Sequence, residues 1–230
     1  MYEYLLLLFV IVWTSFYAFL YAILHKRFNA EWISRVVAIT HALAIARSVE
    51  YTAFIDNTWP FDTMGFTNSH HQNLALCLTA GYFIFEISWC LYMRTEGVLM
   101  LIHHAISITA MLISLWAGRS ASEVLLTTWG SELTNPFLQV RWFLRETKNY
   151  ETVFAFLNDV VFFLLFFVVR VLVGGVVAFH LYHAQETVFV MKVCGFSFYA
   201  LSLLWMVQIY KFAEKRIFGG YKSRLLANSQ

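Results

Sequence analysis

Residues 152–179 read TVFAFLNDVVFFLLFFVVRVLVGGVVAF, and this stretch decides the class of fold. It contains two charged residues, Asp159 and Arg170, in an otherwise apolar run. A helix needs about 20 predominantly apolar residues to cross the hydrocarbon core of a bilayer, and this stretch is long enough. The sequence therefore predicts a transmembrane helix here.

Six further stretches have a similar length and character, and with the first they use most of the 230 residues. We therefore predict an all-α membrane protein of about seven transmembrane helices, packed as a bundle or barrel around a central polar cavity. Residues 1–29 are expected to form an anchor helix and a cytosolic loop, residues 30–215 the main membrane domain, and residues 216–230 a cytosolic basic tail. The six further spans are Tyr4–Leu24, Ile33–Phe54, Gln72–Met93, Val98–Leu115, Ser122–Leu144 and Val188–Phe212.

The composition excludes several other classes of protein. Hydrophobic residues make up 60% of the chain and charged residues 13%, whereas a soluble domain carries about 25% charged residues. A soluble monomer and a disordered chain are both excluded by this balance. The net charge is only +2 and the basic residues form no stripe, which argues against a nucleic-acid partner.

The basic residues predict the orientation of the chain in the membrane. With the N-terminus luminal or extracellular and the C-terminus cytosolic, eleven Lys and Arg residues fall on the cytosolic side and two, Arg119 and Lys192, on the other. We expect an integral membrane protein of the endoplasmic reticulum, with the plasma membrane as the alternative, and the sequence leaves a homodimer open. The eleven residues are Lys26, Arg27, Arg35, Arg94, Arg145, Lys148, Lys211, Lys215, Arg216, Lys222 and Arg224.

Several charged residues lie inside the predicted spans, where each costs about 2.5–3.5 kcal/mol if it faces lipid. We single out six of them: Arg47, Glu50, Glu86, Glu132, Asp159 and Arg170. They are therefore expected to face the interior of the bundle. With a rise of about 1.5 Å per residue, several titratable side chains fall into one layer of the cytosolic half. We predict that this layer and its neighbours line a cavity for a substrate or lipid, formed by His41, Glu86, Ser107, Asn135 and Asp159. The residues Arg47, Glu50 and Arg170 lie in the outer half, and we assign them structural roles.

The fifth span has a continuous polar face. Thr128, Glu132, Asn135 and Gln139 follow one another at i, i+4, i+7 and i+11, which places them on one side of a helix. Pro136 lies within this stretch and cannot donate to the carbonyl of Glu132, so we predict a kink there as a structural feature.

Histidine pairs raise the question of a metal centre. His70, His71, His180 and His183 are predicted on the outer side, while His103 and His104 lie in the cytosolic half, so one metal cluster cannot use both groups. Adjacent histidines on a helix also diverge, which is poor chelating geometry. We predict no metal site; the alternative is zinc held by HLYH at 180–183 with His70 or His71.

The intramembrane pair His103–His104 has a different chemistry available to it. A neutral imidazole beside a carboxylate acts as a general base or as a nucleophile. The alternative is a hydrogen-bonded pair with a structural role.

Two segments carry a resemblance to a known family. HHAISITAMLISLW at 103–116, followed by ELTNPFLQVRWFLRE at 132–146, resembles the TLC-domain family of TRAM, Lag1 and CLN8 proteins, which includes the ceramide synthases. The resemblance covers roughly residues 30–215. It implies a barrel of helices around a lipid-accepting tunnel, and transfer of an acyl chain from acyl-CoA to an amine with the help of a histidine pair, which His103 and His104 match.

One departure from the ceramide synthases concerns the helix after the histidine pair. Those enzymes carry a His-Asp and a further Asp there, whereas this chain reads WGSELTNP at 129–136. Glu132 is the one acid in that segment, and we predict it as the catalytic partner of the two histidines.

Two functional hypotheses follow, both with a membrane lipid or acyl chain as the partner. The first is an acyl-CoA-dependent acyltransferase in which His103 and His104 act as base or acyl acceptor, with acyl-CoA as co-substrate and no permanently bound cofactor. The second is a non-enzymatic lipid-binding protein that regulates membrane lipid composition. A translocation accessory or a channel is disfavoured, because no run of like charges follows one path.

Overall fold

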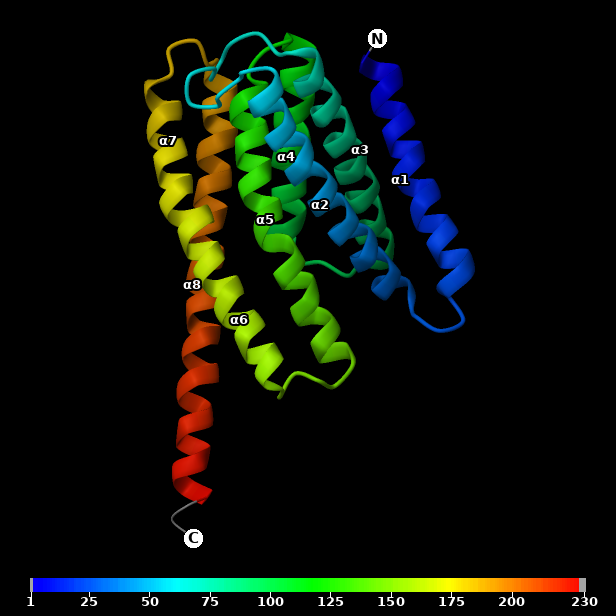
Figure 1. Cartoon of the computed structure of the whole chain (residues 1–230), viewed down its shortest axis with the longest axis vertical. Coiled ribbons are helices and arrows are strands. Elements are labelled where there is room, and N and C mark those ends of the chain that lie inside the picture. The colour runs from blue at the N-terminus through cyan, green and yellow to red at the C-terminus, as the bar shows by residue number, and fades with distance from the viewer. Residues whose placement is uncertain (1, 228–230) are drawn as a thin grey trace.

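A computed structural model describes the backbone of residues 2–227 and the side chains of residues 2–216. Over this range the chain is a bundle of helices that run up and down in sequence order (Figure 1). The elements are α1 (Tyr2–Leu24), α2 (Ala30–Ile55), α3 (His70–Met93), α4 (Val98–Ala117), α5 (Ala121–Glu146), α6 (Val153–Leu165), the π-helical segment η1 (Phe166–Val173), α7 (Gly174–His183) and α8 (Phe189–Ala227).

The prediction of an all-α membrane protein is confirmed. Six helical rods are long and apolar enough to cross a membrane, with α6, η1 and α7 counted as the single rod Val153–His183. The remaining predicted span, α5, does not meet that criterion of composition. It packs against α2, α3, α4 and α6, so its polar face is covered by protein.

The bundle has a buried interior and an apolar exterior. α2 and α3 contribute most to the core, in which Val37, Ile45, Leu76 and Met111 are fully enclosed. Large apolar side chains are exposed along α1, α6, α7 and α8, as expected for helices that face lipid.

α1 lies at the edge of the bundle, against α3 (Figure 1). Trp13 is its buried side chain, and the indole N–H donates to the carbonyl of Leu78 at 3.0 Å. Gly81 of α3 allows close approach, because a Cβ at that position would lie 2.7 Å from Cβ of Phe9. α1 is thus packed closely against α3 along one side.

Local sequence signals set the ends of several helices. Asn29 caps α2 by accepting from the backbone N–H of Trp32. Ser69 and Gln72 form a reciprocal capping box at the start of α3. Such caps satisfy backbone donors that the first turn leaves free. α8 continues through most of the predicted basic tail, and the side chains of Lys222 and Arg224 lie outside the described residues.

Polar contacts hold the loops together at the end of the bundle that carries the N-terminus. The guanidinium of Arg119 donates to the carbonyl of Gly65 at 2.7 Å and to that of Glu186 at 2.8 Å. The carboxylate of Glu123 accepts from the backbone N–H of Gly65 and from the hydroxyl of Thr187, both at 3.1 Å. These contacts connect the α2–α3 loop to the α7–α8 loop and cover this end of the bundle.

A second polar cluster lies just beyond the end of α2. Asp56 accepts hydrogen bonds from Ser69 and from Nδ1 of His71, the latter at 2.7 Å. Burial is the largest influence on the pKa of Asp56 and raises it, but the two hydrogen bonds outweigh burial and lower the pKa below its ordinary value. Asp56 is therefore ionised over the whole neutral range.

We expect this cluster to make stability depend on acid pH. Because the pKa of Asp56 is lowered on folding, its contribution is full above the ordinary Asp range near pH 4 and is lost as the pH falls through the lowered value. Melting curves of the detergent-solubilised protein between about pH 2 and 6 should show a steeper acid loss for wild type than for Asp56→Asn. Parallel curves for the two proteins would contradict this assignment.

Candidate functional site

A central cavity of about 270 Å³ lies in the bundle between α3, α4, α5, the α6–η1 rod and α8. The structure brings five of the predicted site residues to its wall: Glu86, His103, His104, Glu132 and Asn135. It also places Arg170 there. The cavity is further lined by Arg35, Phe83, Glu96, Met100, Ser131, Thr134, Leu138, Gln139, Arg141, Phe162, Phe166, Trp205, Gln208 and Ile209.

The histidine pair enters the cavity from α4. The two rings are buried, with centroids 5.5 Å apart and planes inclined by 62°. Nε2 of His104 lies 4.0 Å from the carboxylate of Glu86. Nδ1 of both rings is buried and makes no hydrogen bond with any side chain or backbone group that the structure describes, so each ring has one nitrogen without a partner among those groups.

Glu132 begins a chain of hydrogen bonds along the polar face of α5. The amide of Asn135 donates to Glu132 at 2.9 Å, and the amide of Gln139 donates to the Asn135 carbonyl at 2.7 Å. The guanidinium of Arg35 donates to the side-chain oxygen Oε1 of Gln139 at 3.0 Å and pairs with the carboxylate of Glu96 at 3.2 Å. Each of the two side-chain amides in this series of hydrogen bonds both donates and accepts. All the donors point toward Glu132, and this common direction stabilises the carboxylate.

His41 lies behind the cavity wall. Its Nδ1 is 3.7 Å from the Glu132 carboxylate, and its ring stacks on Tyr82 with 3.8 Å between centroids. It is completely buried. His41 therefore acts on the cavity only through Glu132, whereas the sequence pattern predicted a place on the wall.

Arg170 projects from the π-helical segment η1. A π-helical turn inside an α-helix changes which residues face inward, and such turns are frequent at functional sites. The guanidinium donates to the hydroxyl of Ser131 and lies over the rings of Phe166, Phe198 and Trp205 at 5.1–5.5 Å. No feature of the sequence pattern predicts this segment.

Two of the predicted cavity residues lie elsewhere. Ser107 lines a separate void of about 40 Å³ between α4, α5 and α8, because it is one helical turn beyond His103. Asp159 lines the α6–α8 cavity and not the central one, and it pairs with Arg141 at 3.6 Å and Arg216 at 2.9 Å. Depth along the helix predicts that Asp159 lies in the same layer as the histidines. The structure shows that Asp159 lies on the side of α6 that faces α8.

Arg47 is an exception to the expectation that the charges within the spans face inward. Its side chain is 82% exposed and pairs with Glu50 at 2.7 Å. Glu50 in turn accepts from the indole of Trp129 at 3.3 Å, so it connects α2 with α5. Arg47 is close enough to the end of α2 to extend toward the membrane interface.

Pro136 lies inside α5, which runs without interruption from Ala121 to Glu146. In the part of the chain that the structure describes, no group of three or more His, Cys, Asp or Glu side chains is placed to hold a metal ion.

Several residues of the site do not follow from the sequence patterns considered above. Tyr82 precedes Glu86 by four residues and therefore shares its helix face, so the spacing alone could have indicated that Tyr82 lies near the site. Gln208 is a polar residue in the apolar run of α8, and Trp205 lies three residues before it. For Trp205 the signal is weak, since aromatic residues are abundant throughout the chain.

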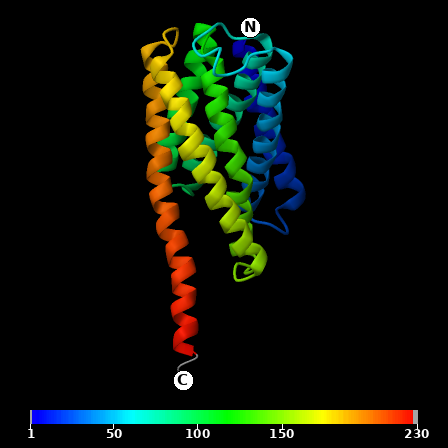
Figure 2. The same ribbon diagram turned by 60° about the vertical axis from the view of Figure 1, so that its left-hand side comes forward.

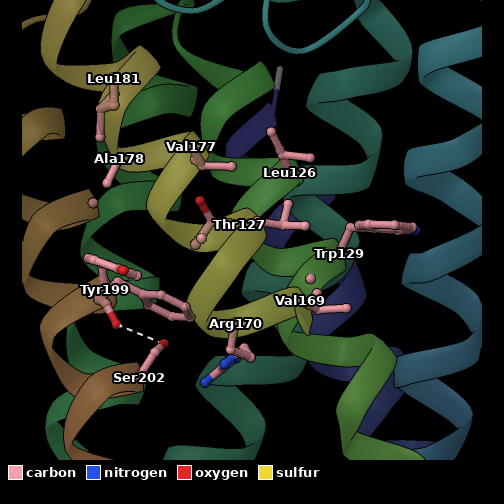
Figure 3. Close-up of a pocket in the computed structure, with 15 residues that line it drawn as sticks. Leu126, Thr127, Trp129, Val169, Arg170, Val177, Ala178, Leu181, Tyr199 and Ser202 are labelled. Atoms are coloured by element: carbon pink, nitrogen blue, oxygen red, sulfur yellow. Dashed lines mark hydrogen bonds between the residues drawn. The ribbon is translucent and has the colours of Figure 1, made fainter. Parts of the chain in front are cut away.

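Two neighbouring spaces adjoin the central cavity. An apolar cavity of about 250 Å³ between α6 and α8 shares Arg141, Phe162 and Ile209 with it. A smaller void of about 50 Å³, between α5, α7 and α8, shares Arg170 with it. Figure 3 shows this void, with Arg170 at the opposite end from Leu181.

The α6–α8 cavity faces the exterior of the bundle. The two helices separate toward their cytosol-predicted ends, as both views show (Figures 1 and 2). Phe156, Leu164 and Tyr210 line the cavity and are exposed at the bundle surface. This outward-facing cavity and the histidine cavity therefore lie side by side and share Arg141, Phe162 and Ile209 in their walls.

Comparison with known proteins decides the family. A model of the TLC domain (TRAM, LAG1 and CLN8) matches residues 27–213. The chain belongs to the TLC domain family. This TLC domain protein is 25% identical over 215 residues to an uncharacterised TLC domain-containing protein of Schizosaccharomyces pombe, with 88% of this chain and 72% of the relative covered.

Two further relatives share the TLC domain protein's sequence at a similar level. Topoisomerase I damage affected protein 4 of Saccharomyces cerevisiae is 24% identical over 209 residues, covering 82% of this chain and 70% of its own. Human TLC domain-containing protein 4 is 29% identical over 147 residues, covering 61% and 54%. These similarities support the family and the multi-pass membrane architecture.

Proposed function

We propose that the protein binds a membrane lipid in the central cavity and acts in membrane-lipid metabolism or homeostasis. The observation that carries this proposal is the junction of two unlike spaces. A cavity lined by His, Glu, Asn and Arg side chains meets an apolar cavity across Arg141, Phe162 and Ile209. A polar head with an apolar chain is the molecule that matches both.

The placement of the α6–α8 cavity supports entry from the bilayer. The apolar cavity lies between α6 and α8, next to side chains that face lipid. A lipid can therefore enter sideways and bring its polar group to the histidine pair without crossing the bundle. The distribution of Lys and Arg supports a cytosolic position for this end of the molecule.

Acyl transfer is a second candidate, favoured by the histidine pair and by the carboxylate of Glu86 near His104. In such a step an imidazole takes the proton of an acceptor amine or hydroxyl as the acceptor attacks the carbonyl of an acyl-CoA thioester. The C–S bond breaks, the sulfur leaves with the electron pair as a thiolate, and the imidazolium returns the proton to that thiolate, which gives the free thiol of CoA. Acyl-CoA is the co-substrate that this candidate requires.

Native mass spectrometry of the gently extracted protein tests the lipid-binding proposal. We expect a retained lipid that dissociates as an intact molecule. Phe162→Trp adds volume where the two cavities meet and should reduce retention several-fold, whereas the matched change Phe154→Trp, on the exposed face of α6, should not. Complete absence of retained lipid from wild type in every detergent used would overturn the proposal. A bound CoA or an acyl adduct on a histidine would favour acyl transfer over simple binding.

A further inference from the structure

Arg170 is a buried cation without an opposite charge beside it. Three arginines line the central cavity, and two of them are paired: Arg35 lies 3.2 Å from Glu96, and Arg141 lies 3.6 Å from Asp159. Among the side chains of residues 2–216, no carboxylate lies within 4.0 Å of the Arg170 guanidinium. Its side chain thus carries a positive charge into the cavity.

The immediate surroundings of Arg170 hold the side chain but do not neutralise it. The residue is 8% exposed, and its Nε has no hydrogen-bond partner in the described part of the chain. The rings of Phe166, Phe198 and Trp205 surround the guanidinium. Aromatic rings fix the orientation of a planar guanidinium, but they offer no oxygen acceptor to its N–H groups.

The two acids of the inner wall are each engaged with another group. Glu132 accepts from Asn135 and lies 3.7 Å from His41. Glu86 lies 4.0 Å from His104. Glu132 is near enough for its charge to act on Arg170, but neither acid lies within 4.0 Å of the guanidinium, so direct contact with an anion is left to a ligand.

The space around Arg170 suits a chain attached to that anion. On one side Arg170 faces the central cavity, which adjoins the apolar α6–α8 cavity at Arg141, Phe162 and Ile209. On the other it lines the void whose far end is apolar, at Val177 and Leu181 (Figure 3). An anionic head at Arg170 therefore leaves apolar space for a hydrocarbon chain.

We infer that Arg170, presented by the π-helical segment, binds the carboxylate or phosphate head of an anionic lipid. This inference rests on the proposed function and narrows its ligand class from membrane lipids in general to anionic ones. A guanidinium presents two parallel N–H donors that match either head, and the hydroxyl of Ser131 beside it can donate a further hydrogen bond.

A binding experiment with matched probes tests this inference. The full-length protein, in nanodiscs of phosphatidylcholine, is titrated with palmitate, palmitoyl-lysophosphatidic acid and monopalmitoylglycerol, which share one acyl chain. Fluorescence of the tryptophans, including Trp205 beside Arg170, reports binding. We expect the two anionic probes to bind at least about tenfold more tightly than the neutral one, the ratio that 1.4 kcal/mol produces.

Variants of Arg170 distinguish binding at this residue from a general electrostatic attraction between the protein and anionic probes. Arg170→Gln should lower affinity for the anionic probes about tenfold or more and leave the neutral probe unchanged, while Arg170→Lys should retain part of the preference. Arg47→Gln is the control, because that arginine is on the exposed surface of α2. Acetate and inorganic phosphate, which have no chain, should not displace palmitate at equal concentration.

Three results would overturn the inference. They are equal affinity of wild type for charged and neutral probes, an anionic preference that survives in Arg170→Gln, and displacement of palmitate by inorganic phosphate at equal concentration. In the first two cases the proposed lipid function stands, because the chain still binds. Failure of all three probes to bind would overturn the proposed function as well. The wild-type preference and Arg170→Lys decide the question even where Arg170→Gln does not fold.

Discussion

If the cavity catalyses acyl transfer, His103→Ala and His104→Ala each lower the rate of that reaction by about two to four orders of magnitude. A positioned general base contributes about this much to the rate. Both imidazoles line the cavity, and each has a nitrogen with no partner among the described groups. His104 is also within 4.0 Å of Glu86. Removal of either ring leaves the fold of α4 intact while it removes the proton acceptor.

The measurement is release of CoA thiol and formation of acylated product by purified protein, with varied acyl-CoA donors and amine or lyso-lipid acceptors. His25→Ala is the matched control, since that histidine is exposed just after the first helix and contacts only α1, through backbone carbonyls and the ring of Tyr21. If wild type forms no more product than the variant that carries both His103→Ala and His104→Ala, acyl transfer is ruled out. Lipid binding then remains as the proposed function.

Gly65→Ala destabilises the protein by about 3 kcal/mol or more, because conformational strain and a steric clash act together. Gly65 has φ of +79°, a conformation that costs an L-residue about 1–3 kcal/mol. A Cβ there would also lie 2.4 Å from the backbone of Glu186 and Thr187, which no rotamer change relieves. The substitution forces apart the two loops that Arg119 and Glu123 connect.

Thermal unfolding in detergent measures this effect, and a loss of about 6–12 °C corresponds to about 3 kcal/mol in a chain of this size. Gly118→Ala separates the two causes. Gly118 also has positive φ, at +65°, but nothing lies within 4 Å of the position that an alanine methyl group would take there, so only the smaller conformational cost applies. Equal losses for the two variants would show that the contact with the α7–α8 loop contributes nothing.

The class of fold and much of the cavity were predictable from sequence, because insertion into a bilayer imposes strong constraints. Length and hydropathy predict the apolar helices. The cost of burying Glu86 and Glu132 in hydrocarbon predicts that they face inward, and the four-residue spacing of the polar residues on α5 predicts their common face. The hydrogen bonds from Gln139 through Asn135 to Glu132 follow that spacing.

The remaining features depend on information that periodicity does not contain. The π-helical segment, which contains Arg170 and follows the helix that carries Asp159, changes which residues face inward. Asp159 instead meets Arg141 and Arg216, partners from other helices. The charged side chain of Arg47 lies on the outer surface of the bundle. Depth along a helix does not reveal which side of the helix a residue occupies.

The divergence of α6 and α8 has a consequence for membrane sidedness. The α6–α8 cavity lies toward one end of these helices, while polar contacts of Arg119 and Glu123 cover the other. Under the proposed function, a lipid that enters between α6 and α8 comes from the monolayer at that end of the bundle, whichever way the chain inserts. Such a protein would sample the composition of one leaflet, and a change that it made there would add to the asymmetry of the membrane around it.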